Sequence, residues 1–103
     1  MGACSFVNAV KRKDAKSVKE AFKQEVERSQ YESGRSYSGE IGMKHDFVRA
    51  RNAKECKTLR EAIDEADRLI DEHGNSMDKW GPAFFIEVEG DEGGWVFFGF
   101  ASS

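Results

Sequence analysis

The stretch at residues 33–39 combines residue types that bind anionic groups. Its glycines let backbone amides approach a ligand, its hydroxyl side chains donate hydrogen bonds, and the guanidinium of Arg35 matches a phosphate or carboxylate. The ring of Tyr37 can stack on a base or lie in the core, and Lys44 and His45 add basic side chains nearby. These residues predict a surface for a small anionic ligand such as a nucleotide. The alternative is a helix end followed by an ordinary polar strand.

The loop at residues 78–83 places a tryptophan before Gly-Pro. The indole of Trp80 either closes the end of the core, with its N–H on a backbone carbonyl, or forms a stacking platform beside the charge of Lys79. We group this loop with the first stretch as one candidate binding site. Its predicted ligand contacts are Arg35, Ser36, Tyr37, Ser38, Lys44, His45, Lys79 and Trp80.

Patterns typical of enzymes and metal sites are missing from the sequence. It contains no nucleophile elbow, no zinc-protease motif, no P-loop and no dinucleotide-binding glycine motif. Cys4 and Cys56 lie far apart, without zinc-site spacing, and two lone thiols suit a reducing compartment. A hydrolase or transferase would have to use His45 with Glu40 or Asp46, and nothing favours a particular reaction. We therefore expect a binding protein rather than an enzyme, without catalytic residues, metal or cofactor.

The two halves of the chain differ in charge. Residues 1–54 carry 12 Lys and Arg against 7 Asp and Glu, whereas residues 55–103 carry 4 against 12. The basic half could steer an anionic ligand, and the asymmetry could equally promote head-to-tail or two-fold self-association; the alternative is solvated helix faces with no partner. The acidic half offers an alternative function, because Asp64, Asp67 and Asp71 could imitate nucleic-acid phosphate and inhibit a host protein through its basic groove. Direct nucleic-acid binding is not expected, because duplex-binding proteins are usually basic overall.

Two amphipathic helices are predicted. The first runs from residue 15 or 17 to 33, because Ser17 and Glu20 form a capping box ahead of apolar residues at helical spacing. The second begins after Thr58, which opens another such box, and ends at Gly74, the expected C-cap. Both helices should bury one side against a common core.

In the remaining segments side chains alternate between two faces, as they do in β-strands. Strands are predicted at residues 36–43, 46–51, 83–89 and 95–101, with a weaker one at 5–10. The segment 95–101 is apolar on both sides, which indicates a central or doubly covered strand, and a glycine-rich loop joins it to 83–89 as a hairpin. We expect an α+β two-layer sandwich, with a four- to five-stranded, mainly antiparallel sheet and both helices on one face; a ferredoxin-like arrangement is one option. The uncovered apolar face predicts a homodimer.

Length and composition fit a single domain over residues 1–103. Hydrophobic residues make up 39% and aromatic residues 12% of the chain, which is enough for a modest core. No apolar run approaches the ~20 residues of a membrane span, and no secretory signal is visible. We therefore expect a cytoplasmic protein without a membrane partner.

Three motifs occur together from the first predicted helix onward. They are Tyr-Ser-Gly-Glu-Ile at residues 37–41, Asp-Lys-Trp-Gly-Pro-Ala at 78–83 and Trp-Val-Phe-Phe-Gly-Phe-Ala-Ser at 95–102. The combination resembles a pattern in small, uncharacterised proteins of bacteriophages and their bacterial hosts. The resemblance implies no activity and no catalytic residue. It implies a prokaryotic or phage setting, with the host cytoplasm as location, in which capture of a nucleotide would act against a host defence signal.

Overall fold

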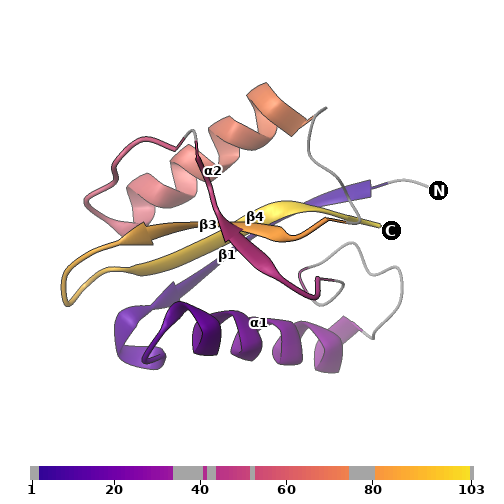
Figure 1. Ribbon diagram of the computed structural model, residues 1–103, viewed down its shortest axis with the longest axis horizontal. Helices are drawn as coiled ribbons and strands as arrows, with labels where there is room; N and C mark the ends of the chain where they lie inside the picture. The colour runs from indigo at the N-terminus through magenta and orange to yellow at the C-terminus, as the bar shows by residue number, and fades with distance from the viewer. Residues whose placement is uncertain (1–2, 34–40, 42–43, 52, 75–80, 103) are drawn as a thin grey trace.

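Four strands form one mixed sheet, and two helices pack against it (Figure 1). The computed structural model describes residues 3–33, 41, 44–51, 53–74 and 81–102. In chain order the elements are β1 (Ala3–Lys11), the short 3-10 helix η1 (Arg12–Asp14), α1 (Val18–Ser33), β2 (Phe47–Arg49), α2 (Leu59–His73), β3 (Ala83–Val88) and β4 (Gly94–Ser102). The strand order is β1-β4-β3-β2, in which β4 is antiparallel to both neighbours and β2 is parallel to β3. The predicted α+β class, with a four-stranded, mainly antiparallel sheet, is confirmed.

The two helices begin where their capping residues predict. The Ser17 Oγ accepts a hydrogen bond from the Glu20 N–H at 3.2 Å, and the Thr58 Oγ1 accepts one from the Glu61 N–H at 3.1 Å. Each bond satisfies a backbone donor that lacks a partner inside the helix. α2 ends at His73, with Gly74 as its C-cap, as the sequence predicts.

Each face of the sheet carries one helix, because β3 and β4 are apolar on both sides. Odd-numbered side chains pack with Phe22 of α1, and even-numbered ones pack with Ala66 and Leu69 of α2. The first set contains Phe85, Trp95 and Phe97; the second contains Ile86, Val88, Val96 and Phe98. This alternation confirms that 95–101 is doubly covered. It corrects the expectation that both helices share one face, and with it the ferredoxin-like option.

The predicted hairpin is confirmed, and its loop spans residues 89–93. Gly90 adopts a positive φ of 95°, which favours glycine, and its carbonyl accepts a hydrogen bond from the Gly93 N–H at 3.0 Å. The weaker strand prediction at 5–10 is confirmed as the longer β1, whereas β2 is shorter than predicted. The strand predicted at 36–43 lies outside the described residues, apart from the buried Ile41.

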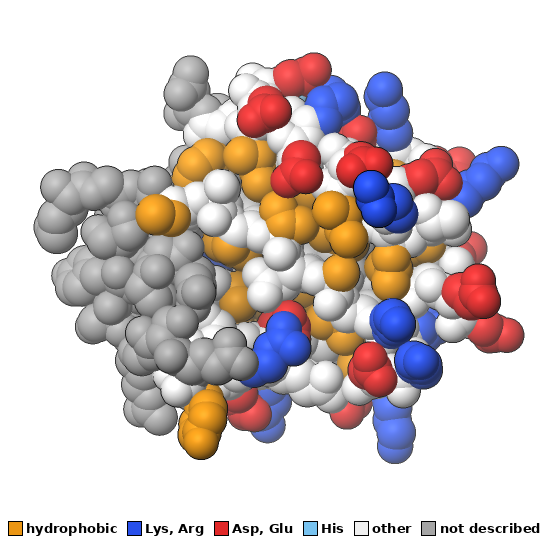
Figure 2. Space-filling view, turned by 180° about the vertical axis from the view of Figure 1, so that it is seen from behind, with side chains coloured by type: hydrophobic (Ala, Val, Ile, Leu, Met, Phe, Trp, Pro, Cys, Tyr) orange, Lys and Arg blue, Asp and Glu red, His pale blue; other side chains and the backbone are white. Residues whose placement is uncertain are grey.

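The two outer strands differ in length. β2 has three residues and pairs with only half of β3, whereas β1 has nine residues and pairs with β4 along its whole length. Figure 1 views the sheet edge-on, with β2 in front, α2 above and α1 below. Figure 2 therefore looks onto the β1 side, where hydrophobic side chains gather between rims of charged ones.

Candidate functional site

The structure describes two of the eight predicted ligand contacts, Lys44 and His45. Arg35, Ser36, Tyr37, Ser38, Lys79 and Trp80 lie outside the described residues. Lys44 is buried, and its Nζ donates a hydrogen bond to the Gly81 carbonyl at 2.8 Å. His45 is exposed. Lys44 thus contacts the loop at residues 78–83 through Gly81, but its ammonium group is not presented to solvent.

A surface cavity of about 500 Å³ lies at the carboxyl-terminal end of β2. The Ala50 N–H donates to the Phe85 carbonyl at 2.9 Å, and the chain then leaves the sheet. The edge of β3 beyond Phe85 forms one wall of the cavity, and the segment before α2 forms the other. The carboxyl ends of parallel strands are a common place for ligands in open sheets. The lining residues are Arg49, Ala50, Ala53, Lys54, Glu55, Cys56, Lys57, Phe85, Ile86, Glu87 and Glu89.

The β3 wall holds a carboxylate between two guanidinium groups. The Glu87 carboxylate accepts hydrogen bonds from Arg49 at 3.0 Å and from Arg12 at 3.3 Å. The same guanidinium groups lie over aromatic rings, Arg49 over Phe85 and Arg12 over Trp95. The bond from Arg49, and then the one from Arg12, hold the pKa of the Glu87 carboxyl below its usual range. Of the two guanidinium groups only that of Arg49 lines the cavity, where it faces the carboxylate of Glu87.

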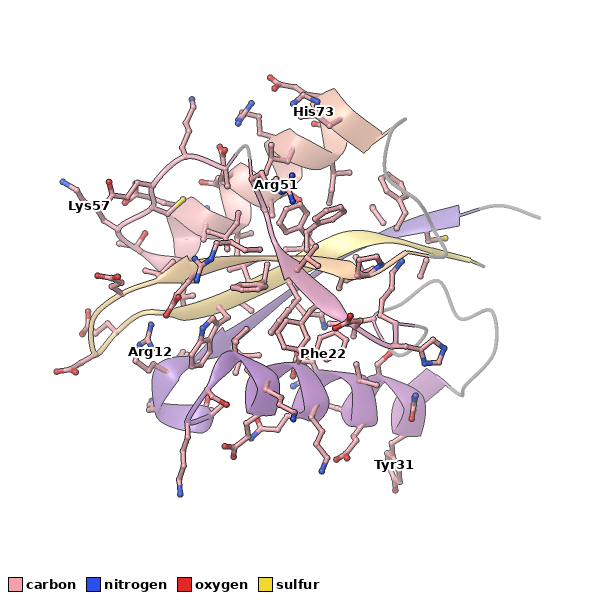
Figure 3. All side chains as sticks on the ribbon, in the orientation of Figure 1. Arg12, Phe22, Tyr31, Arg51, Lys57 and His73 are labelled. Carbon is pink, nitrogen blue, oxygen red and sulfur yellow. The ribbon has the colours of Figure 1, made fainter. Side chains whose placement is uncertain are left out.

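The opposite wall presents two exposed lysines, Lys54 and Lys57. Neither side chain takes part in an ion pair with any carboxylate of the described residues. Lys57 projects from the loop that precedes α2 (Figure 3). Glu55 and Glu89 also line the cavity and are exposed. The opening therefore offers both ammonium groups and carboxylates to a ligand.

A buried carboxylate ties the lysine wall to α2. Glu65 is 6% exposed and accepts a hydrogen bond from the Lys54 backbone N–H at 2.8 Å. It also accepts from Nε and Nη2 of Arg68 at 2.8 and 2.6 Å. The hydrogen bonds from Arg68, helped by the one from Lys54, lower the pKa of Glu65 to about 2 despite its burial. The wall is therefore held in place by a group that stays ionised at neutral pH.

Cys56 contributes a buried thiol to the cavity lining. Its Sγ donates to the Lys54 carbonyl at 3.3 Å. Burial, with the nearby charges of Glu65 and Glu61, raises the pKa of the thiol, so it stays protonated at neutral pH. A protonated thiol is a weaker nucleophile than a thiolate.

The described residues contain no group of three or more His, Cys, Asp and Glu side chains that could hold a metal ion. Asp46, the predicted partner of His45, accepts a hydrogen bond from the Phe47 N–H at 2.8 Å. Its carboxylate therefore caps the start of β2. The other predicted partner of His45, Glu40, lies outside the described residues.

The alternative site is the outer side of α2. Asp64, Asp67 and Asp71 are all exposed. Asp64 lies 3.9 Å from Arg60, and both side chains are mostly in solvent. Arg68 on the same helix binds Glu65 and Glu72, so the acidic side is interrupted by arginines. The structure thus brings the three aspartates to one surface that is acidic but not uniformly so.

The sequence prediction missed Lys54 and Lys57 as possible ligand contacts. A signal was present, because two apolar strand segments flank a single amphipathic helix at 58–73. This order allows a parallel crossover, and ligands gather where the first strand of such a unit ends.

No helix in the described ranges is both long enough and apolar enough to cross a membrane. In comparisons with known proteins, the chain matches no protein family, no curated protein and no solved structure.

Proposed function

We propose that this chain is a non-enzymatic binding protein that captures a small anionic ligand, of the class of a nucleotide, in the cavity at the end of β2. The observation that carries the proposal is the pairing of a cavity of about 500 Å³ with two lysines that form no ion pair among the described residues. This volume falls within the ~300–1,000 Å³ of small-molecule sites. Lys54 and Lys57 would bind the phosphate, while Glu55 and Glu89 would accept hydrogen bonds from amino groups of the base.

The fixed geometry of the walls supports this function. Glu65 holds the Lys54 backbone against α2, and Arg49 is held over Phe85 by its bond to Glu87. A site that is already ordered loses less conformational entropy when a ligand binds. In the phage setting implied by the sequence resemblance, such a protein would sequester a host signal nucleotide.

A thermal-shift series tests the proposal. The panel contains nucleoside mono- and triphosphates, cyclic dinucleotides and inorganic phosphate at millimolar concentration. A ligand at 100 times its Kd stabilises the folded state by about 2.7 kcal/mol, which is a readily measured rise in Tm. Exchanging both Lys54 and Lys57 for Glu should abolish the rise, whereas Lys23→Glu on α1, also exposed and unpaired among the described residues, should leave it unchanged.

A third variant distinguishes ligand binding in the cavity from ligand binding at the stretch predicted from the sequence. If Arg35→Glu abolishes the rise and the double lysine variant keeps it, the ligand binds at the Arg35 stretch and the cavity assignment is wrong. If no compound in the panel raises Tm, the nucleotide class is wrong.

The second candidate function is inhibition of a host protein through the acidic side of α2. The exposure of Asp64, Asp67 and Asp71 on one surface favours it. Exchanging all three for Lys should abolish capture of a host protein in a pull-down, and the Lys23→Glu variant should retain it. Capture that survives the exchange contradicts this function.

A further inference from the structure

Another cavity, of about 280 Å³, lies between α1 and β1. α1 contributes Glu25, Arg28 and Ser29 to its lining, and β1 contributes residues 5–8. The volume is close to the lower end of the ~300–1,000 Å³ of small-molecule sites, so it suits a small ligand. β1 and β2 lie at opposite ends of the strand order, and a site here is therefore separate from the proposed nucleotide cavity.

Two polar side chains interrupt the apolar surfaces that α1 and β1 bury against each other. Phe6 and Val10 of β1 belong to the core cluster on the α1 face, and Asn8 lies between them on the same face. On α1, Glu25 lies one turn after the buried Ala21 and is only 5% exposed. Burying a carboxylate costs free energy unless it is paired and hydrogen-bonded. Such departures from apolar packing are expected where a protein has a functional site.

The carboxylate of Glu25 uses one of its two oxygens. Oε1 accepts hydrogen bonds from Nδ2 of Asn8 at 3.2 Å and from Nη2 of Arg28 at 2.5 Å. Oε2 accepts no hydrogen bond from any described residue. A buried carboxylate oxygen without a donor is costly. Because Glu25 lines the cavity, a ligand in the cavity can supply the donor that Oε2 lacks.

Arg28 offers hydrogen-bond donors beside this oxygen. Its side chain is 60% exposed, and Nη2 is the one nitrogen of its guanidinium that donates to a described residue. A guanidinium group has five N–H donors, and its planar shape matches a carboxylate. Glu25 and Arg28 are the two charged residues of the lining, so their charges cancel. The cavity therefore matches a ligand that carries one positive and one negative group.

We propose that this cavity binds a small zwitterion of the class of a free α-amino acid. The ligand's ammonium group donates to Oε2 of Glu25, and its carboxylate accepts from Arg28. Because these two side chains are in contact, the charged groups of the ligand must also be close together, as they are on a single carbon atom of an α-amino acid. Phe6, which is buried in the same lining, supplies an apolar wall.

Isothermal titration calorimetry on the full chain tests the proposal. The probes are the standard L-amino acids, each added alone at millimolar concentration. At least one should bind. Its N-acetyl derivative and its carboxamide should each bind about tenfold more weakly or less, because each removes one charge-assisted hydrogen bond. Absence of binding by every amino acid overturns the proposal, and so does a blocked derivative that binds as tightly as the free amino acid.

Variants of α1 locate the binding site. Glu25→Gln keeps the shape of the side chain but removes its charge, and should weaken binding by about tenfold or more. Glu27→Gln is the matched control, because Glu27 is exposed on the same helix and forms no ion pair among the described residues; it should bind as the wild type does.

A variant at the mostly exposed Arg28 keeps the proposal testable if Glu25→Gln fails to fold. Arg28→Gln should weaken binding of the free amino acid but leave that of its carboxamide unchanged, because the carboxamide lacks the negative group that Arg28 binds. Equal affinity of Arg28→Gln and wild type for the free amino acid overturns the proposal, as does a folded Glu25→Gln variant that binds as tightly as the wild type. The exchange of Lys54 and Lys57 for Glu should not affect this binding, which distinguishes it from nucleotide capture.

Discussion

Replacing Glu65 by Gln should destabilise the protein and loosen one wall of the cavity. The carboxylate accepts three hydrogen bonds from Lys54 and Arg68, and an amide of the same shape can accept only at its single oxygen. The new NH₂ group would face the donors that the second carboxylate oxygen now satisfies. A part-buried donor without an acceptor costs about 1–3 kcal/mol.

The size of the effect follows from the shifted pKa. A fall in the pKa of the Glu65 carboxyl from 4.5 to about 2 corresponds to a contribution of at most about 3.4 kcal/mol to the free energy of unfolding at neutral pH. The Arg68 side chain is 32% exposed, and water therefore screens part of this interaction. We expect Glu65→Gln to lower the free energy of unfolding by about 2 kcal/mol at pH 7, which lowers Tm by about 10 °C for a chain of this size.

The loss should depend on pH with a definite sign. Because the carboxyl pKa is lower in the folded state, its stabilising contribution is complete above the unfolded pKa and disappears as pH falls through the folded pKa. The difference between wild type and Glu65→Gln should therefore be constant above about pH 5.5. It should fall to about two-fifths of its neutral value at pH 3 and approach zero near pH 1.

Urea unfolding followed by far-UV circular dichroism at pH 7 and pH 3 measures both quantities. Asp67→Asn on the same helix is the matched control, because Asp67 is exposed and forms no ion pair within the described part of the chain. Its change in stability should stay within about 0.5 kcal/mol. Equal stability of Glu65→Gln and wild type at pH 7, or a difference that does not shrink at pH 3, would refute the role given to this carboxylate.

Further predictions concern the hairpin, the core and the start of α2. Gly93→Ala should lower the free energy of unfolding by more than about 2 kcal/mol, because a Cβ there would lie 2.0 Å from the Val88 carbonyl oxygen. Gly90→Ala should lower it by about 1 kcal/mol, because Gly90 has open space around it but a positive φ. Equal midpoints of unfolding for the two variants would contradict this. Phe97→Ala should cost about 3–5 kcal/mol in urea unfolding, since the ring is fully buried, and a loss below 1 kcal/mol would show that the core can collapse around it. Thr58→Ala should cost about 1 kcal/mol, measured as a lower Tm, through the lost cap of α2; an unchanged Tm argues against the cap.

Local signals in the sequence predicted the elements well. Capping boxes at Ser17 and Thr58 located the helix starts because their side chains bond to backbone groups only three residues away. The pattern at 95–101 predicted double burial because strand side chains alternate strictly between two faces. Both inferences depend on interactions between near neighbours in the chain.

The placement of the helices could not be obtained in the same way. Amphipathicity shows that a helix buries one side, but not which face of the sheet receives it. The choice depends on distant strands: β1 turns Phe6 and Val10 to the α1 face, and β3 turns Ile86 and Val88 to the α2 face. The basic residues at the end of β2 were likewise visible in the sequence. Only the parallel pairing of β2 with β3 brings Lys54 and Glu87 to the same cavity.

The central position of β4 has a consequence for synthesis of the chain. β4 lies between β1 and β3, yet it follows all the other elements in sequence. Until residues 94–102 have left the ribosome, β1 lacks the strand that it pairs with in the structure, and both helices lack the central part of the surface that they cover. The nascent chain must therefore keep its hydrophobic strand segments apart until this last strand inserts between them, and we expect folding to be slow and dependent on chaperones.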